Sequence, residues 1–202
     1  MIDFVSTFII FFAVIDPIGT VPVFIAVTSA YDDQVKRKIA IKATFISALI
    51  LLFFVVAGEV ILTAIDIPLS AFQIAGGIVL FLFALTMIFG ESKPEEELKM
   101  VQSSTEAAIF PLAVPSIASP GAMLAAVMLT ENNRFNFLEQ LLTSVTMLSV
   151  LVVVLVFLLA ASFIHRLIGD SGASIISRVM GLILASVAVA SVLAGIKEYF
   201  AL

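Results

Sequence analysis

The sequence lacks cysteine and tryptophan, and it carries little charge. Its 202 residues include a single histidine, and only 12% are Asp, Glu, Lys or Arg. No disulfide framework can form, so cysteine usage does not indicate a redox compartment. The net charge is −5, and ten basic residues against fifteen acids offer no groove for phosphates. A nucleic-acid partner is therefore not expected.

Apolar side chains are what the chain has in excess. They make up 62% of the residues, and the mean hydropathy is +1.24, far from the values of soluble domains. We expect an all-α polytopic membrane protein embedded in a lipid bilayer, because the apolar blocks are continuous and lack the alternating pattern of barrel strands. The first residues have no basic region of a cleaved signal, so the first apolar segment is expected to remain as a transmembrane helix.

Uncharged runs predict six transmembrane helices. Asp16 is the only charge between Phe4 and Tyr31, and the second span is expected to continue through Glu59. The predicted spans are 4–31, 43–65, 67–90, 107–130, 140–164 and 179–196.

Basic residues predict the orientation of these spans. Eight of the ten lysines and arginines flank the first, third and fifth connections. Such residues gather in cytoplasmic loops, so both termini are expected on the outer side of the plasma (inner) membrane. The third connection contains the acidic run ESKPEEELKM, residues 91–100, which we interpret as a solvated connector. His165 stands beside Arg166 at a predicted boundary, and a lone histidine makes no metal site.

The two halves of the chain, 1–100 and 101–202, resemble each other. Three stretches align in the same order. They are DPIGTVPVFIAVT from Asp16 with SPGAMLAAVMLT from Ser119, TFISALILL from Thr44 with TMLSVLVVV from Thr146, and GGIVLFLFAL from Gly76 with MGLILASVAV from Met180, which aligns Gly77 with Gly181. Each half contains three predicted spans, an odd number, so the second copy is expected to insert upside down. The sequence therefore predicts two inverted three-helix repeats, an architecture of transporters whose sites lie near the membrane midplane.

Both members of the first aligned pair place a proline in the middle of an apolar run. Asp16 and Ser119 are favoured N-cap residues, and Pro17 and Pro120 occupy the first helical position that proline favours. Proline also disfavours the α conformation of the residue before it. The first and fourth spans are therefore predicted to be broken helices.

A helix start inside hydrocarbon needs a polar partner. Its first N–H groups have no intrahelical acceptor, and they carry roughly half a positive charge. Gly19 and Gly121 follow the two breaks and leave room beside the backbone. A single break of this kind fits either a proline kink without a ligand or a ligand-binding site. Two breaks at matching positions, one of them with an ionisable Asp16, favour the site.

The residues around the breaks carry a resemblance to a known family. DPIGTVPVF in the first span and PLAVPSIASPGA, residues 111–122, in the fourth resemble the paired signatures of the MarC family of membrane proteins. Length and span number agree over essentially the whole chain. The family includes small neutral amino acid transporters and was once linked to multiple antibiotic resistance. Thr20 stands where the family often has Asn, and Ser119 where it usually has Gly, so either difference bears on selectivity.

A zwitterionic amino acid needs an anion for its ammonium group and donors for its carboxylate. Asp16 is the candidate anion, because a carboxylate inside a membrane costs about 2.5 to 3.5 kcal/mol and is a functional candidate by default. The helix start at Gly121 and Ala122, capped by neutral Ser119, is the candidate donor group. Asp16 has two rival roles, which are binding a coupling proton or sodium ion and capping its own helix.

The candidate site residues fall into two ranks. From the breaks, the substrate- or ion-binding candidates are Asp16, Pro17, Gly19, Thr20, Ser119, Pro120, Gly121 and Ala122. The candidates of lower rank are Thr44, Ser47, Glu59, Thr146 and Ser149, since hydroxyl groups in membrane helices often bond to their own helix or join neighbours. Gly76, Gly77 and Gly181 are expected to permit close helix contact, and Gln73 to be structural.

The leading functional prediction is a secondary transporter of small neutral amino acids such as glycine or alanine, working by alternating access. A channel or exporter for another small solute fits the same broken helices, and antibiotic export is a family association only. An enzyme is not expected, because no cysteine, histidine pair or Ser–His partnership is present at membrane depth. No cofactor is expected besides a coupling proton or sodium ion, and the oligomeric state is left open.

Overall fold

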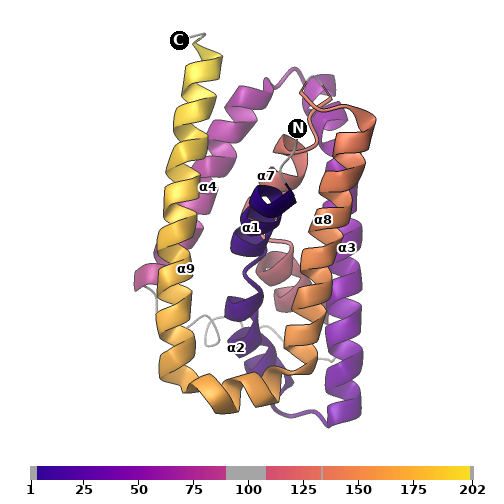
Figure 1. The fold of residues 1–202 in the computed structure, drawn as a ribbon, viewed down its shortest axis with the longest axis vertical. Helices are drawn as coiled ribbons and strands as arrows, with labels where there is room; N and C mark the ends of the chain where they lie inside the picture. Colours follow the sequence, from indigo (N-terminus) through magenta and orange to yellow (C-terminus); the bar gives the residue numbers. More distant parts are fainter. Residues whose placement is uncertain (1–3, 90–107, 133, 201–202) are drawn as a thin grey trace.

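Helices form all the regular structure of the described residues. The computed structural model describes residues 4–89, 108–132 and 134–200 (Figure 1). The acidic connector 91–100 and the proposed boundary between the halves lie outside these ranges, as does the side chain of His165. The elements in chain order are α1 (Phe4–Ile15), α2 (Pro17–Thr28), α3 (Asp33–Ala64), α4 (Leu69–Phe89), η1 (Ala108–Ile117), α7 (Pro120–Met128), α8 (Phe137–Leu159) and α9 (Ala161–Tyr199).

The helices fit a multi-pass membrane protein. Five segments are long and apolar enough to cross a bilayer, and η1 with α7, bent by 56°, makes a sixth if the pair is counted as one span. The second span continues past Glu59 to Ala64, as predicted. The fifth was predicted to reach Ile164 but ends at Leu159. Its apolar run continues through the turn at Ala160 into α9, so hydropathy alone does not mark this boundary.

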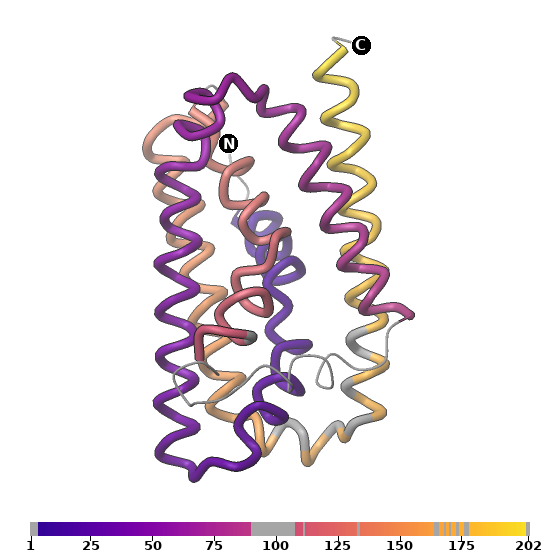
Figure 2. Tube along the Cα trace, turned by 180° about the vertical axis from the view of Figure 1, so that it is seen from behind, coloured from indigo at the N-terminus to yellow at the C-terminus, as the bar shows by residue number. Residues whose placement is uncertain are grey.

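Two helix pairs enclose a central group of broken segments. α4 lies beside α9 and α3 beside α8, while α1, α2, η1 and α7 lie between the pairs (Figures 1 and 2). In the most apolar stretch of α1–α2, 61% of the residues are buried, against 22% in α3 and in α9. The broken segments therefore form the core, and the outer helices present apolar side chains outward. Such a surface suits lipid, since soluble proteins rarely expose large apolar patches.

Both described ends of the chain lie toward one end of the molecule. The start of α1 and the end of α9 are in the upper half of Figure 1, and the α2–α3 and α8–α9 connections are at the bottom. The bottom end includes the first turns of α3, with Lys36, Arg37 and Lys38. We call it the basic end below.

Prolines account for the irregular backbone of the core. The residue before a proline is disfavoured in the α conformation. Asp16, Phe110, Val114 and Ser119 each precede a proline, and each has non-helical backbone angles. The prediction of a single break in the fourth span was therefore too simple, because η1 is itself interrupted at Phe110 and Val114. The peptide bond between Val114 and Pro115 is cis.

Glycines let α4 and α9 approach closely. A Cβ atom added at Gly77 would lie 3.0 Å from the carbonyl oxygen of Ala188, and one added at Gly181 would lie 3.0 Å from that of Ala84. These contacts run antiparallel along the two helices. The predicted packing role of Gly77 and Gly181 is thereby confirmed, and Gly76 makes a similar close approach to α7.

We expect Gly77→Val to destabilise the protein by about 1 to 3 kcal/mol, since the larger side chain has to push two backbones apart. Thermal unfolding in detergent micelles measures this effect. Ala75→Val is the matched control, because it introduces the same side chain two residues away at an exposed position. Equal melting temperatures for the two variants would contradict the close contact.

Candidate functional site

Asp16 joins α1 to α2. Its backbone is left-handed, with φ 52° and ψ 67°, a conformation that Asp and Asn tolerate better than most residues. Its N–H donates to the Phe12 carbonyl at 3.0 Å, and its own carbonyl accepts from the N–H of Thr20 at 3.1 Å. Asp16 therefore belongs to the hydrogen-bond ladders of both helices, and only 2% of it is exposed.

The Asp16 carboxylate caps α2. Its Oδ1 accepts from the N–H of Gly19 at 2.9 Å, which satisfies one of the free donors at the start of the helix. A Cβ atom at Gly19 would lie 2.0 Å from Asp16 Oδ2. Residue 19 must therefore be glycine as long as the cap keeps this geometry.

Ser119 caps α7 and reaches across to α1. Its Oγ accepts from the N–H of Ala122 at 3.1 Å and donates to the carbonyl of Val14 at 2.7 Å. Ser119 is fully buried. The last carbonyls of α1 have no further donors within their helix, so Ser119 satisfies one of them while capping another helix. The two predicted breaks are thus brought together.

A second polar link runs between the two breaks. Ser116 Oγ donates to Thr20 Oγ1 at 3.3 Å, and Thr20 Oγ1 donates to the Asp16 carbonyl at 2.9 Å. Both side chains are buried. Sequence reasoning did not single out Ser116. The available signal was its place between Pro115 and Ser119, within the signature 111–122.

The remaining predicted residues are placed as follows. Pro17 and Pro120 occupy the first positions of α2 and α7, as predicted. A Cβ atom at Gly121 would lie 2.4 Å from Leu80 Cδ1, so this glycine makes room for α4. Ser47 Oγ lies 2.9 Å from its own Ala43 carbonyl and 3.3 Å from the Ala113 carbonyl, which brings it beside η1. The other three hydroxyls, those of Thr44, Thr146 and Ser149, donate to carbonyls of their own helices.

Two buried polar atoms on the outer helices have no hydrogen-bond partner within the described residues. They are Gln73 Oε1, on α4, and Thr143 Oγ1, on α8. A buried polar atom without a partner is costly. Their helices flank the core from opposite sides, so both atoms are additional candidates for contact with a polar solute.

The break residues line neither of the two cavities described here. One cavity, of about 290 Å³, lies at the α3–α4 connection. The other, of about 510 Å³, lies at the basic end. Neither includes Asp16 or Ser119, which are almost completely buried. Asp16 and Ser119 are therefore closed off from solvent in this conformation.

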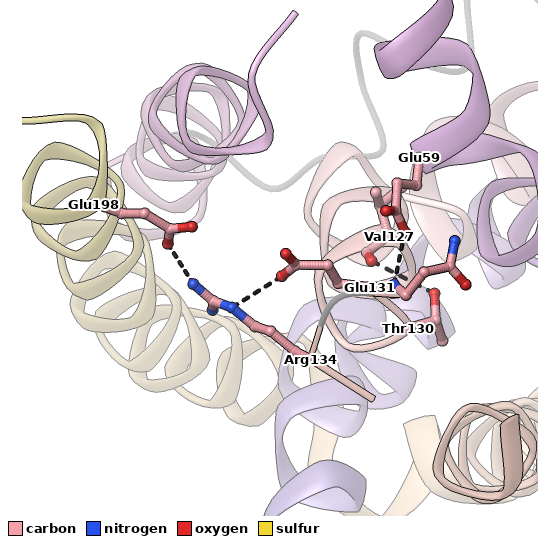
Figure 3. Close-up of polar contacts among 7 residues, drawn as sticks. Glu59, Val127, Thr130, Glu131, Arg134 and Glu198 are labelled. Atoms are coloured by element: carbon pink, nitrogen blue, oxygen red, sulfur yellow. Dashed lines mark hydrogen bonds and ion pairs between the residues drawn. The ribbon is translucent and has the colours of Figure 1, made fainter. Parts of the chain in front are cut away.

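Glu59 lies away from the breaks, at the end opposite the basic end. Its Oε2 accepts from the backbone N–H of Asn132 at 2.7 Å (Figure 3). Glu59 also lines the 290 Å³ cavity, together with Asp66 and Glu131. Its contact is thus with the connection between α7 and α8, and the cavity it lines is acidic.

An ion-pair network ties the same connection to α9. Arg134 Nε lies 3.0 Å from Glu131 Oε2, and Arg134 Nη2 pairs with Glu198 Oε2 (Figure 3). Burial raises the pKa of the Glu131 carboxyl above its ordinary value. Arg134 opposes this shift, while the negative charges of Glu198 and Glu59 add to it. Sequence reasoning did not find this network, because Arg134 and Glu198 are 64 positions apart in the chain.

No metal centre emerges from the described part of the chain. It contains no group of three or more His, Asp or Glu side chains arranged to hold a metal ion. The chemistry available at the breaks is that of one carboxylate, three hydroxyls and two helix starts.

Comparison with known proteins gives the family. The model for "MarC family integral membrane protein" matches residues 1–200. A "UPF0056 membrane protein" of Archaeoglobus fulgidus is 34% identical over 198 residues, covering 96% of this chain and 92% of its own. The "UPF0056 inner membrane protein YhgN" of Escherichia coli is 32% identical over 199 residues, covering 98% of each. No solved structure is significantly similar. The predicted resemblance is confirmed over nearly the whole length, and the chain belongs to the MarC family of integral membrane proteins.

Proposed function

We propose that this protein is a secondary transporter of small neutral amino acids that works by alternating access. The observation that carries the proposal is the junction of two helix starts of different chemistry. One is capped by the carboxylate of Asp16 and the other by the hydroxyl of Ser119, and Ser119 bonds directly to the end of α1.

The proposed inverted repeat is supported by the pattern of helix contacts. In the alignment of the two halves α1 corresponds to η1, α2 to α7, α3 to α8 and α4 to α9. If the two halves are exchanged, each contact should have a counterpart. The counterpart of α1–α8 is η1–α3, that of α2–α8 is α7–α3, and that of α2–α9 is α7–α4. Every member of these pairs is a contact in the structure. An arrangement of this kind places a binding site where the broken helices of the two halves meet.

Matching residues of the two halves also make matching bonds. Thr28 Oγ1 donates to the Phe24 carbonyl at 2.5 Å, and Thr130 Oγ1 donates to the Ala126 carbonyl at 2.5 Å. Asp16 and Ser119 both cap through the third residue that follows. These pairs support the alignment by chemistry as well as by position.

The two helix starts suit the two ends of a zwitterion. The Asp16 carboxylate is the partner for an ammonium group, and the N–H groups of the α7 start are the partners for a carboxylate. The space beside Gly19 and Gly121 is taken up by Asp16 and Leu80, so little room is left at the breaks and glycine or alanine fits better than a bulky solute. The same carboxylate is the candidate for a coupling proton or sodium ion.

Access to this site requires the closed centre to open toward one end at a time. The acidic cavity at the α3–α4 connection and the larger cavity at the basic end lie on opposite sides of the breaks. On this basis we interpret the structure as a closed state, with the acidic cavity as the vestibule on its side of the breaks. We further propose that the pairing of Arg134 with Glu198, which ties the α7–α8 connection to α9, holds the acidic side shut.

Asp16→Asn should abolish gradient-driven uptake of glycine and alanine. Asparagine tolerates the left-handed backbone and retains an oxygen to cap α2, so the substitution removes the charge and keeps the structural role. The measurement is uptake of labelled glycine and alanine into liposomes that contain the purified protein, under an imposed proton or sodium gradient.

The matched control is Asp32→Asn. Asp32 caps α3 in the same way, with Oδ1 accepting from the N–H of Val35 at 2.8 Å, but it is exposed. Uptake should survive this change. Uptake that persists in Asp16→Asn would reduce Asp16 to a cap. Labelled uptake that is not stimulated by unlabelled solute inside the liposomes would favour a channel over a carrier.

Raising the pH from mildly acidic to neutral should open the connection between α7 and α8. The pKa of Glu131 is raised while it is buried and returns to its ordinary value once it is exposed, so the closed state binds the proton more readily. Protonated Glu131 therefore stabilises the closed state at low pH, and this stabilisation is lost as the pH rises through the raised pKa of Glu131. Thr130 is buried, and the chain has no cysteine of its own. In the Thr130→Cys variant, the rate at which a thiol reagent labels the new cysteine therefore measures how often the connection opens.

The reference for this measurement is Thr130→Cys combined with Glu131→Gln. Dividing the two labelling rates at each pH removes the pH dependence of the thiol itself. The ratio should rise with pH, and Arg134→Gln should move the rise to higher pH because Arg134 lowers the pKa of Glu131. A ratio that does not change with pH would contradict the role of Glu131.

A further inference from the structure

A cavity of about 510 Å³ lies where α3 begins and α8 turns into α9. Its walls come from Phe24 near the end of α2, the first turns of α3, and the α8–α9 turn. None of its lining residues belongs to a helix break or to the Arg134 network. The chemistry of this cavity is therefore unexplained by the proposed transport site.

The polar lining of this cavity is mainly cationic. Lys36 and Arg37 line it, with Asp33 as the one carboxylate and Ser162 as a hydroxyl. Lys36 is half-buried. Within the described ranges neither Lys36 nor Arg37 forms an ion pair, whereas Arg134 at the opposite end pairs with two carboxylates. Two adjacent cations without an anionic partner among the described residues form a favourable place for a phosphate.

The apolar lining continues onto the outer surface. Leu158 is buried, while Leu159 and Phe163 are 49% and 64% exposed. These side chains flank the cavity on the outer helices, which present apolar surface to lipid. A soluble anion would gain nothing from this apolar rim, whereas acyl chains would pack against it.

We propose that this cavity binds a phospholipid with a net negative headgroup. Lys36 and Arg37 hold the phosphate, Ser162 lies near the polar headgroup, and the acyl chains follow Leu159 and Phe163. Basic pockets between helices at the membrane surface suit such headgroups. The proposal is independent of the transported solute, and a bound lipid would link the start of α3 to the α8–α9 turn.

A single tryptophan can report this binding, because the chain has none of its own. The full-length Phe163→Trp variant is placed in phosphatidylcholine vesicles that contain either brominated phosphatidylglycerol or brominated phosphatidylcholine. We expect brominated phosphatidylglycerol to quench the tryptophan more strongly than brominated phosphatidylcholine does. Removing one cation should lower the affinity for phosphatidylglycerol relative to phosphatidylcholine by roughly five-fold. Lys36→Gln combined with Arg37→Gln should remove this preference.

The matched control is Lys38→Gln combined with Lys42→Gln. This pair removes the same charge from the same helix at positions that do not line the cavity, and it should keep most of the preference. Equal loss in both double variants would indicate diffuse surface attraction and overturn the proposal. Equal quenching by the two lipids, or a preference abolished by inorganic phosphate, would overturn it as well. Leu159→Trp is the second reporter if Phe163→Trp does not fold.

Discussion

The hydrogen bond from Ser119 Oγ to the Val14 carbonyl determines how the core is assembled. A helix that ends inside the molecule leaves carbonyls without donors, and a helix that begins there leaves N–H groups without acceptors. Each such group is costly when it is buried in apolar surroundings. Ser119 meets both needs at once, since it donates to the end of α1 and accepts from Ala122 at the start of α7. Separating the two broken spans would leave the Val14 carbonyl without its donor, so the breaks stay together and the outer helix pairs pack around them.

Asp16 also caps a helix that begins inside the molecule, but its capping group is a carboxylate, whereas that of Ser119 is a neutral hydroxyl. Its left-handed backbone and its cap require a short side chain with an oxygen, and asparagine provides both. The local geometry therefore needs an acceptor and has no need of a charge. A carboxylate buried inside a membrane protein carries a further cost that a cap does not explain. This excess is the physical argument for a role beyond capping, and it is the reason why the proposed function centres on Asp16.

Local chemistry was predictable from the sequence, whereas most hydrogen bonds and ion pairs between distant residues were not. The positions of the breaks and both caps follow from Asp-Pro and Ser-Pro, because capping and proline geometry act within four residues. The left-handed turn at Asp16 was missed, since the same residue types also fit the extended conformation that Ser119 adopts. The partnership of Ser116 with Thr20 and the pairing of Arg134 with Glu198 join residues separated by 96 and 64 positions. Such contacts depend on the whole fold, which hydropathy does not specify.

The packing also suggests which parts move together in the proposed transport cycle. Along the α4–α9 contact, glycines place one backbone against the carbonyls of the other helix at two matching positions. A contact of this kind is lost as soon as the helices separate, so sliding or rotation within the pair is costly. The core, by contrast, meets its surroundings through flexible side chains, such as Leu80 against Gly121, and through single hydroxyl bonds such as that of Ser47 to Ala113. Small shifts can exchange such bonds for others at little cost. We infer that the α4–α9 pair moves as one rigid unit against the broken helices, and a cross-link between α4 and α9 that leaves transport intact would agree with this arrangement.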